Sequence, residues 1–105
     1  MATKEKNPIP CRLRIGNKKY SVEIVEAMLK KAWQRSIQYD NHRIQIARNS
    51  NVSGRRFKDH EMHATFWHEL THAILHDMDH SLHLNEKFVE DFSTRLAQAV
   101  KTARF

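Results

Sequence analysis

Hydrophobic and polar positions repeat with helical spacing between residues 59 and 78. No glycine or proline interrupts this segment, and apolar side chains return every three or four positions at Met62, Phe66, Leu70 and Ala73. Such spacing places them along one face of an α-helix, where they can pack against a core. The pattern predicts a helix from about Asp59 to Met78.

A second helical pattern begins at Asn85 and runs to the end of the chain. Its predicted apolar face recurs every four residues and comprises Phe88, Phe92, Leu96 and Val100, widened by Val89 and Ala99. Asn85 suits the N-cap position, because its side chain can accept a hydrogen bond from the first turn. We therefore expect Glu86 in that first turn, where its negative charge complements the helix dipole.

The first quarter of the chain alternates apolar and polar residues, as strands do. Residues 11–15 and 19–25 form two such runs, with Tyr20, Val22 and Ile24 on one face of the second. Gly16 and Asn17 between the runs indicate a turn, so the segment predicts a β-hairpin.

The segment between the hairpin and the long helix is read as a further helix and a strand. The positions of Met28, Leu29 and Ala32 favour a helix from Glu26 to about Gln38. His42 to Ala47 predicts a strand with Ile44 and Ile46 turned inward. By analogy with zinc peptidases, we expect this strand to lie at a sheet edge and to bind extended substrate by β-addition.

Within the first long helix lies the pattern His68-Glu69-Leu70-Thr71-His72. Residues four apart on a helix share a face and lie roughly 6 Å apart, so both imidazoles can reach one ion. Glu69 lies about 100° round the helix, where it can reach a metal-bound water without ligating the metal. This arrangement is typical of a zinc site with a general base, and we predict one Zn²⁺ per chain.

A catalytic zinc normally has three protein ligands, so one more residue is needed. His76 lies about 12 Å along the helix from His68, too far to share an ion, and is expected to be a helix-end residue. The downstream candidates are His80, His83, Glu86, Glu90 and Asp91. We favour Glu86 because it opens the second helix and can face the first, while Glu90 could ligate instead or orient a ligand.

The active helix together with the stretch from Asn85 to Phe92 resembles gluzincin-type zinc metallopeptidases, in particular small phage-type relatives of the ImmA/IrrE family. The resemblance implies a minimal zincin-like fold, with His68, His72 and Glu86 as zinc ligands and Glu69 as base. The chain departs from these relatives in having Glu90 where they often carry Asn. A second similarity is to SprT-like domains, which complete the site with a later histidine, and the stretch from His80 to His83 keeps that alternative open.

Length and composition fit one small cytoplasmic domain. The 105 residues predict a flexible arm at 1–9 and a single α+β domain at 10–105, with a small antiparallel or mixed sheet packed on the two helices. Nothing resembles a signal peptide or a membrane span, so no membrane partner is expected. Cys11 is the single cysteine, expected to be buried, and it allows no internal disulfide.

The net charge of +6 raises the question of an acidic partner. The basic residues are scattered without interleaved aromatic residues, so nucleic acid is only weakly supported as a partner. The densest cluster, residues 53–58, reads either as a solvated loop or as a rim facing substrate or DNA. The sequence does not indicate an oligomeric state.

These residues favour a zinc-dependent endopeptidase that hydrolyses a protein or peptide substrate through a zinc-activated water, with Glu69 as general base. The alternatives are a zinc-stabilised module that binds protein or DNA without cleaving it, and a SprT-like protease associated with DNA. Tyr39, His42, His80 and His83 are candidates for stabilising the oxyanion, whereas Asp77 and Asp79 could orient an imidazole.

Overall fold

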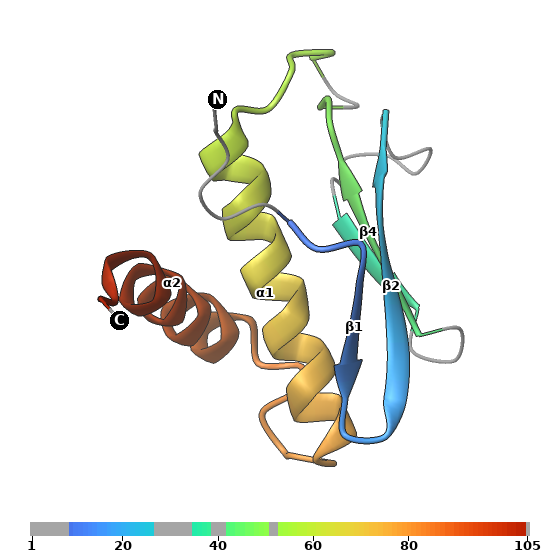
Figure 1. The fold of residues 1–105 in the computed structure, drawn as a ribbon, viewed down its shortest axis with the longest axis vertical. Helices are drawn as coiled ribbons and strands as arrows, with labels where there is room; N and C mark the ends of the chain where they lie inside the picture. Colours follow the sequence, from blue (N-terminus) through green and yellow to red (C-terminus); the bar gives the residue numbers. More distant parts are fainter. Residues whose placement is uncertain (1–8, 27–34, 39–41, 51–52, 105) are drawn as a thin grey trace.

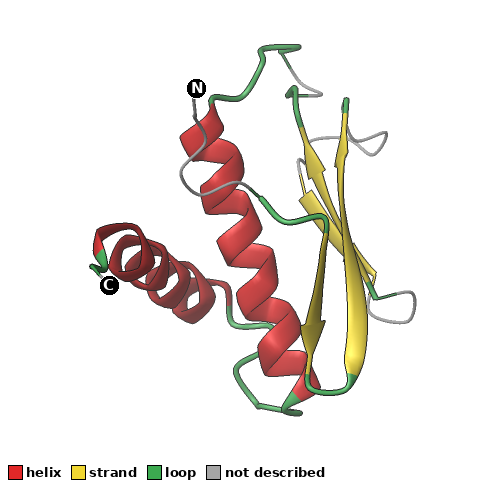
Figure 2. Ribbon diagram, in the orientation of Figure 1, coloured by secondary structure: helices red, strands yellow, loops and turns green. Residues whose placement is uncertain are grey.

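A computed structural model of the chain describes residues 9–26, 35–38, 42–50 and 53–104, with the backbone alone at 35–38. Its elements, in chain order, are β1 (Arg12–Ile15), β2 (Lys18–Val25), β3 (Arg35–Gln38), β4 (Arg43–Ala47), α1 (Asp59–Asp77) and α2 (Glu86–Thr102). Helix α1 lies along one face of the sheet, and α2 crosses α1 on the side away from the sheet (Figures 1 and 2). The predicted arm at 1–9 falls almost wholly outside the described residues.

Strands β1 and β2 form the predicted hairpin. They pair antiparallel, with Leu13 opposite Tyr20 and Ile15 opposite Lys18. Gly16 in the connecting turn has a φ of 61°, a conformation that is free of strain only for residues without a Cβ. The turn therefore depends on glycine at this position.

The sheet is mixed and has the order β1-β2-β4-β3. β2 and β4 run parallel, whereas β3 and β4 run antiparallel. The α+β class and the mixed sheet are thus confirmed. The predicted edge position of the strand at 42–47 is wrong, because β4 is hydrogen-bonded on both sides and β3 forms the edge.

The helix predicted from Glu26 to Gln38 is also wrong over its last four residues. Residues 35–38 are strand β3, paired with β4 so that Ile37 lies opposite Ile44. The apolar positions in this part of the chain are compatible with the repeat of a helix and with that of a strand. Pairing with the buried strand β4 favours the strand at 35–38. The part of the prediction at 27–34 lies outside the described residues.

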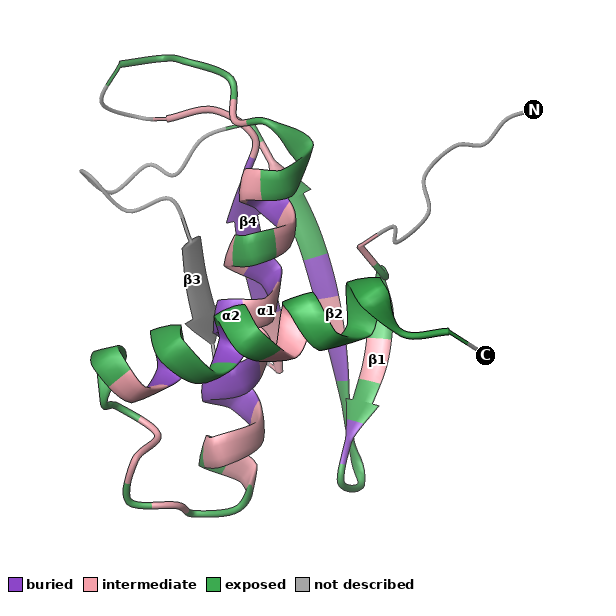
Figure 3. Ribbon diagram, turned by 90° about the vertical axis from the view of Figure 1, so that its left-hand side faces the viewer, coloured by how far each residue is buried: buried purple, intermediate pink, exposed green. Residues whose placement is uncertain are grey.

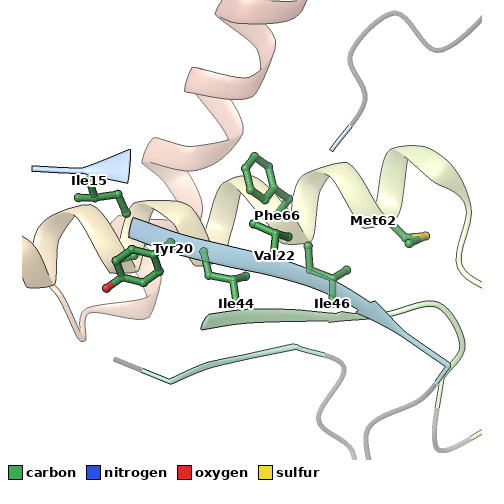
Figure 4. Close-up of a cluster of buried hydrophobic side chains, with 8 residues drawn as sticks. Ile15, Tyr20, Val22, Ile44, Ile46, Met62 and Phe66 are labelled. Carbon is green, nitrogen blue, oxygen red and sulfur yellow. The ribbon is translucent and has the colours of Figure 1, made fainter. Parts of the chain in front are cut away.

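The core lies between the sheet and α1. Met62, Phe66 and Ala73 of α1 pack against side chains of the facing strands, with Leu70 partly buried at the margin. The buried strand residues are Ile15, Tyr20, Val22, Ile44 and Ile46 (Figure 4). This confirms the apolar face predicted for the helix and the inward direction of Ile44 and Ile46.

Polar contacts define both ends of α1. At its start the Lys58 N–H donates to Glu61 Oε1 at 2.7 Å, and Arg55 donates to both Glu61 carboxylate oxygens at 3.2 and 3.3 Å. The Arg55 hydrogen bond is the main reason that the pKa of Glu61 lies below its ordinary value. At the end, the Asp79 N–H bonds the His76 carbonyl and the His80 N–H bonds the Leu75 carbonyl, which together form a Schellman motif.

The C-terminal end of α1 is tied to the hairpin. Lys18 Nζ donates to Asp77 Oδ1 at 2.8 Å, and this hydrogen bond raises the pKa of Lys18. A Cβ on Gly16 would lie 2.8 Å from Asp77 Oδ2, so the turn and the carboxylate are in close contact. Asp77 therefore acts in docking the hairpin, and the alternative that it orients a ligand imidazole has no support from its contacts.

Helix α2 buries only part of the apolar face that was predicted for it, since Val89 is buried but Phe92 and Val100 are not. Val89 and Ser93 are its buried residues, whereas Phe92 and Val100 are 48% and 42% exposed. Most of the helix surface is exposed (Figure 3). The four-residue period was correct for a helix, and the two buried residues lie on the same side of α2 as Glu86.

Two residues near the start of the described chain differ from their predicted environment. Cys11 is exposed, contrary to the prediction that it is buried. Ile9, assigned to the flexible arm, packs against the core. A search of the described helices finds none with the length and apolar character that a membrane span requires.

Ile44→Ala tests the position of the core. Ile44 has no exposed surface, whereas Ile24 on the neighbouring strand is 39% exposed. We expect Ile44→Ala to lower the free energy of unfolding by about 2–5 kcal/mol, and the same substitution at Ile24 to lower it by about 1 kcal/mol or less. Urea denaturation of both variants measures the difference, and equal losses would contradict the described core.

Candidate metal centre

Two histidines on α1 and one glutamate on α2 meet where the helices cross. The four-residue spacing of His68 and His72 brings their ring centroids to 4.9 Å from each other. The predicted cap holds the start of α2, since Asn85 Oδ1 accepts a hydrogen bond from the Phe88 N–H at 2.9 Å. Glu86 is therefore the first residue of α2, as the sequence predicted.

The Nε2 atoms of both imidazoles face the Glu86 carboxylate. Glu86 Oε1 lies 3.0 Å from His68 Nε2, and Oε2 lies 3.3 Å from His72 Nε2. Around a tetrahedral ion with bonds of about 2.1 Å, ligand atoms lie roughly 3.4 Å apart. Each residue offers a ligand atom within 4.8 Å of the other two, so this triad could hold a metal ion with little movement.

The other nitrogen of each ring is held by a hydrogen-bond acceptor. His68 Nδ1 lies 2.8 Å from Glu90 Oε1, and His72 Nδ1 lies 2.6 Å from the backbone carbonyl oxygen of His83. A carboxylate and a carbonyl oxygen only accept hydrogen bonds, so we infer that both Nδ1 atoms carry the proton and donate it. In the neutral imidazoles the lone pair then lies on Nε2, toward Glu86.

A positive charge between the rings and Glu86 would stabilise this arrangement. Two Nε2 lone pairs facing a carboxylate repel it, and the histidines are only 3% and 4% exposed. Protons on Nε2 would relieve the repulsion, and a metal ion would relieve it while leaving the rings neutral. Imidazole and carboxylate are the donor set that borderline divalent metals such as zinc prefer.

Glu86 is ionised at neutral pH. Burial is the largest single influence on this side chain and opposes ionisation. When the histidines are protonated, the hydrogen bond from His68 and the charges of His72 and His68 together outweigh it, so the pKa of Glu86 lies below its ordinary value of 4.5. The residue thus presents the charged carboxylate that a metal ligand needs.

Glu69, the predicted general base, lies beside these ligands on α1 and is 4% exposed. A carboxylate is rarely buried unless nearby groups compensate its charge. Its burial next to a cluster that attracts a cation distinguishes it from Glu61 on the same helix, which makes an exposed ion pair with Arg55. The burial agrees with a functional position for Glu69.

The other residues considered as a third ligand have different contacts. His80 Nδ1 accepts a hydrogen bond from the Leu82 N–H, and the His83 ring contacts the His80 carbonyl and the His76 ring. Asp91 is paired with Lys87 at 3.0 Å. Among the described residues, the group that could hold a metal contains Glu86 and none of these.

His42 and Asp79, predicted to stabilise an oxyanion and to orient an imidazole, are not part of the metal-binding triad, and Tyr39 is not among the described residues. The His42 ring contacts the Tyr20 ring in a tilted arrangement, with ring centroids 5.1 Å apart. Asp79 is exposed at the end of α1. The oxyanion role proposed for His42 therefore has no support from its contacts.

Sequence reasoning missed one member of the site entirely. The His83 carbonyl orients His72, but a main-chain oxygen has no residue-type signature, and His83 drew attention only through its side chain. The orienting role of Glu90 was one of two alternatives. The sequence spacing could have indicated this role, because Glu86 and Glu90 are one helical turn apart and both can face the same imidazole.

The comparisons with known proteins add no relative. The chain matches no protein-family model, and neither the curated proteins nor the solved structures give a match. The resemblance to metallopeptidases therefore remains a prediction carried by the residues themselves.

Glu90→Ala tests the orienting contact. Without the acceptor for its Nδ1–H, His68 loses its fixed tautomer and orientation, so we expect zinc affinity to fall about 10–100-fold with stoichiometry unchanged. Asp91→Ala, which removes the adjacent exposed carboxylate, should leave affinity unchanged. Competition titration with a zinc chelator measures both, and complete loss of the metal in Glu90→Ala would instead identify Glu90 as a ligand.

Proposed function

We propose that the chain is a zinc-dependent metallopeptidase with a zincin-like fold. The observation that carries the proposal is the pair of imidazoles whose Nδ1 atoms are held by Glu90 and the His83 carbonyl while both Nε2 atoms face Glu86. A purely structural zinc site is usually closed by four protein ligands. Three protein ligands would leave the fourth position for water or substrate, as catalysis requires.

His68, His72 and Glu86 would hold the ion. When bound, zinc lowers the pKa of a coordinated water toward neutrality and polarises the carbonyl of the scissile peptide bond. Two neutral imidazoles and one carboxylate leave a net positive charge on the centre, which supports both effects. Glu90 and the His83 carbonyl keep the imidazoles neutral and aligned by accepting their Nδ1 protons.

Glu69 would act as the general base. Its carboxylate accepts a proton from the attacking water, whose oxygen forms the new bond to the carbonyl carbon. The same proton passes to the leaving nitrogen as the C–N bond breaks, so Glu69 returns to its ionised state. Retention of a buried carboxylate beside His68 supports this role, because zinc binding alone does not require it.

Strand β3 is the candidate for binding extended substrate. It is an edge of the sheet, and it also contacts α1, the helix that carries His68 and His72. An edge strand presents unpaired backbone groups, with which a protein or peptide segment could pair as an added strand. The role first assigned to the strand at 42–47 therefore passes to its neighbour.

Glu69→Gln tests the proposed chemistry. Glutamine keeps the size of the side chain but cannot accept the proton, so we expect cleavage to fall about 10²–10⁴-fold with one zinc still bound. Glu61→Gln, the same substitution in the exposed first turn of α1, should leave cleavage unchanged. Cleavage is measured on fluorescently labelled casein and, by mass spectrometry, on a random peptide library.

Metal dependence provides a separate control. Removal of zinc with a chelator should abolish cleavage, and one equivalent of zinc should restore it. Equal cleavage by wild type and Glu69→Gln would contradict the assignment of the base. Wild-type protein that binds zinc and cleaves neither probe would contradict the proposal and favour a zinc-stabilised binding module.

A further inference from the structure

The solvent side of the sheet carries a cluster of basic residues. Ile44 and Ile46 point toward α1, so the alternating residues of β4 point to the other side of the sheet. The register places Arg43 beside Ser21 and Ser21 beside Arg12. Arg14 and Lys19 form the next pair of the hairpin that points to the same side of the sheet. We call Arg12, Arg14, Lys19 and Arg43 the basic face.

These four cations have no acidic partner among the described residues. Other basic residues are paired, as Lys18 is with Asp77 and Arg55 is with Glu61. The nearest acidic residue on the same side of the sheet is Glu23, which accepts a hydrogen bond from Gln45 at 3.0 Å. The basic face is thus an array of like charges that an external anion would stabilise.

The charges of the chain are divided between the two layers. In the described stretches 9–26 and 42–50, six basic residues accompany only two acidic ones, Glu23 and Glu26. The remaining described acidic residues, eight in all, belong to α1, α2 and the loop between them, and seven basic residues accompany them between 53 and 104. Among the described residues, the excess of positive charge therefore lies on the sheet and not on the helices.

The dimensions of the basic face suit a phosphate backbone. Neighbouring strands lie about 4.8 Å apart and alternate residues about 6.8 Å apart along a strand, so the four cations lie within roughly 12 Å. Duplex DNA carries one negative charge per about 1.7 Å of its axis, which gives roughly seven phosphates over that length. Arginine and lysine side chains only donate hydrogen bonds, as phosphate oxygens require.

We propose that the basic face binds the phosphate backbone of duplex DNA independently of base sequence. Binding to single strands relies on aromatic side chains that stack on bases, and protein interfaces rely on aromatic anchors. The single aromatic residue of β1, β2 and β4 is Tyr20, which is buried in the core. The proposal goes beyond the peptidase function and does not depend on it.

Salt-dependent binding to a fluorescently labelled 20-base-pair duplex tests the proposal. If all four cations contact phosphates, the logarithm of the binding constant should fall with the logarithm of salt concentration with a slope of about −3.6. In the double variant Arg12→Gln/Arg14→Gln the slope should become shallower by about 1.8 units. A second pair, Lys19→Gln/Arg43→Gln, should give the same change.

A charge-matched control separates position from net charge. Arg95→Gln/Lys101→Gln on α2 also removes two positive charges from the net +6, and it should leave affinity and slope unchanged. His68→Ala should bind DNA like wild type, so failure of the metal centre does not affect this test. Thermal denaturation confirms that each variant is folded.

Three results would overturn the proposal. Wild-type protein that does not bind the duplex at 50 mM salt would exclude it. An equal loss of binding in the α2 control would show that only net charge matters. Tighter binding to a single-stranded oligonucleotide or to polyglutamate than to the duplex would show that the partner is wrong.

Discussion

The crossing of α1 and α2 brings two imidazoles and a carboxylate into contact, an arrangement that a cation between them would stabilise. Helix α2 buries only Val89 and Ser93 among its described residues, and its remaining contacts with α1 include the polar links from Glu86 and Glu90 to the histidines. The Glu90 link is favourable for a neutral ring that donates its Nδ1–H, whereas the Glu86 contacts become favourable when a proton or a metal ion supplies positive charge at Nε2. Metal binding would then contribute to docking α2 as well as to chemistry, so part of the binding free energy is folding free energy.

The parts of the fold that could be predicted from the sequence are those determined by residues close together in the chain. Gly16 fixes the hairpin turn, Asn85 fixes the start of α2, and the period of Met62 and Phe66 fixes the face of α1. The strand at 35–38 could not be predicted in this way, because it is specified by pairing with β4, a partner from a later part of the chain. Phe92 was misplaced because α2 buries the side that carries Val89 and Ser93 and not its row of phenylalanines.

The same distinction applies to the candidate site. His68, Glu69 and His72 follow from helical spacing, and Glu86 follows from its place just after a cap. The choice between Glu86 and Glu90 needed the distances, since one carboxylate faces both Nε2 atoms and the other faces a Nδ1. The His83 carbonyl depends on how the loop after Asp79 turns back toward α1, and side-chain types do not encode that path.

The two layers of the molecule carry opposite chemistry. The helical layer gathers carboxylates around a site suited to a cation, and the sheet presents unpaired cations on its solvent side. A partner bound to the sheet would therefore leave the metal centre accessible. The proposed anion binding and the proposed hydrolysis can be combined in one small domain because α1 separates them.

X-ray absorption at the zinc edge, measured on protein loaded with one equivalent of zinc, tests the central claim most directly. The account predicts about four nitrogen or oxygen ligands at about 2.0–2.2 Å, two of them imidazoles. It also predicts that one imidazole is lost in His72→Ala. A spectrum with oxygen ligands alone, or one that is the same in wild type and His72→Ala, would contradict it.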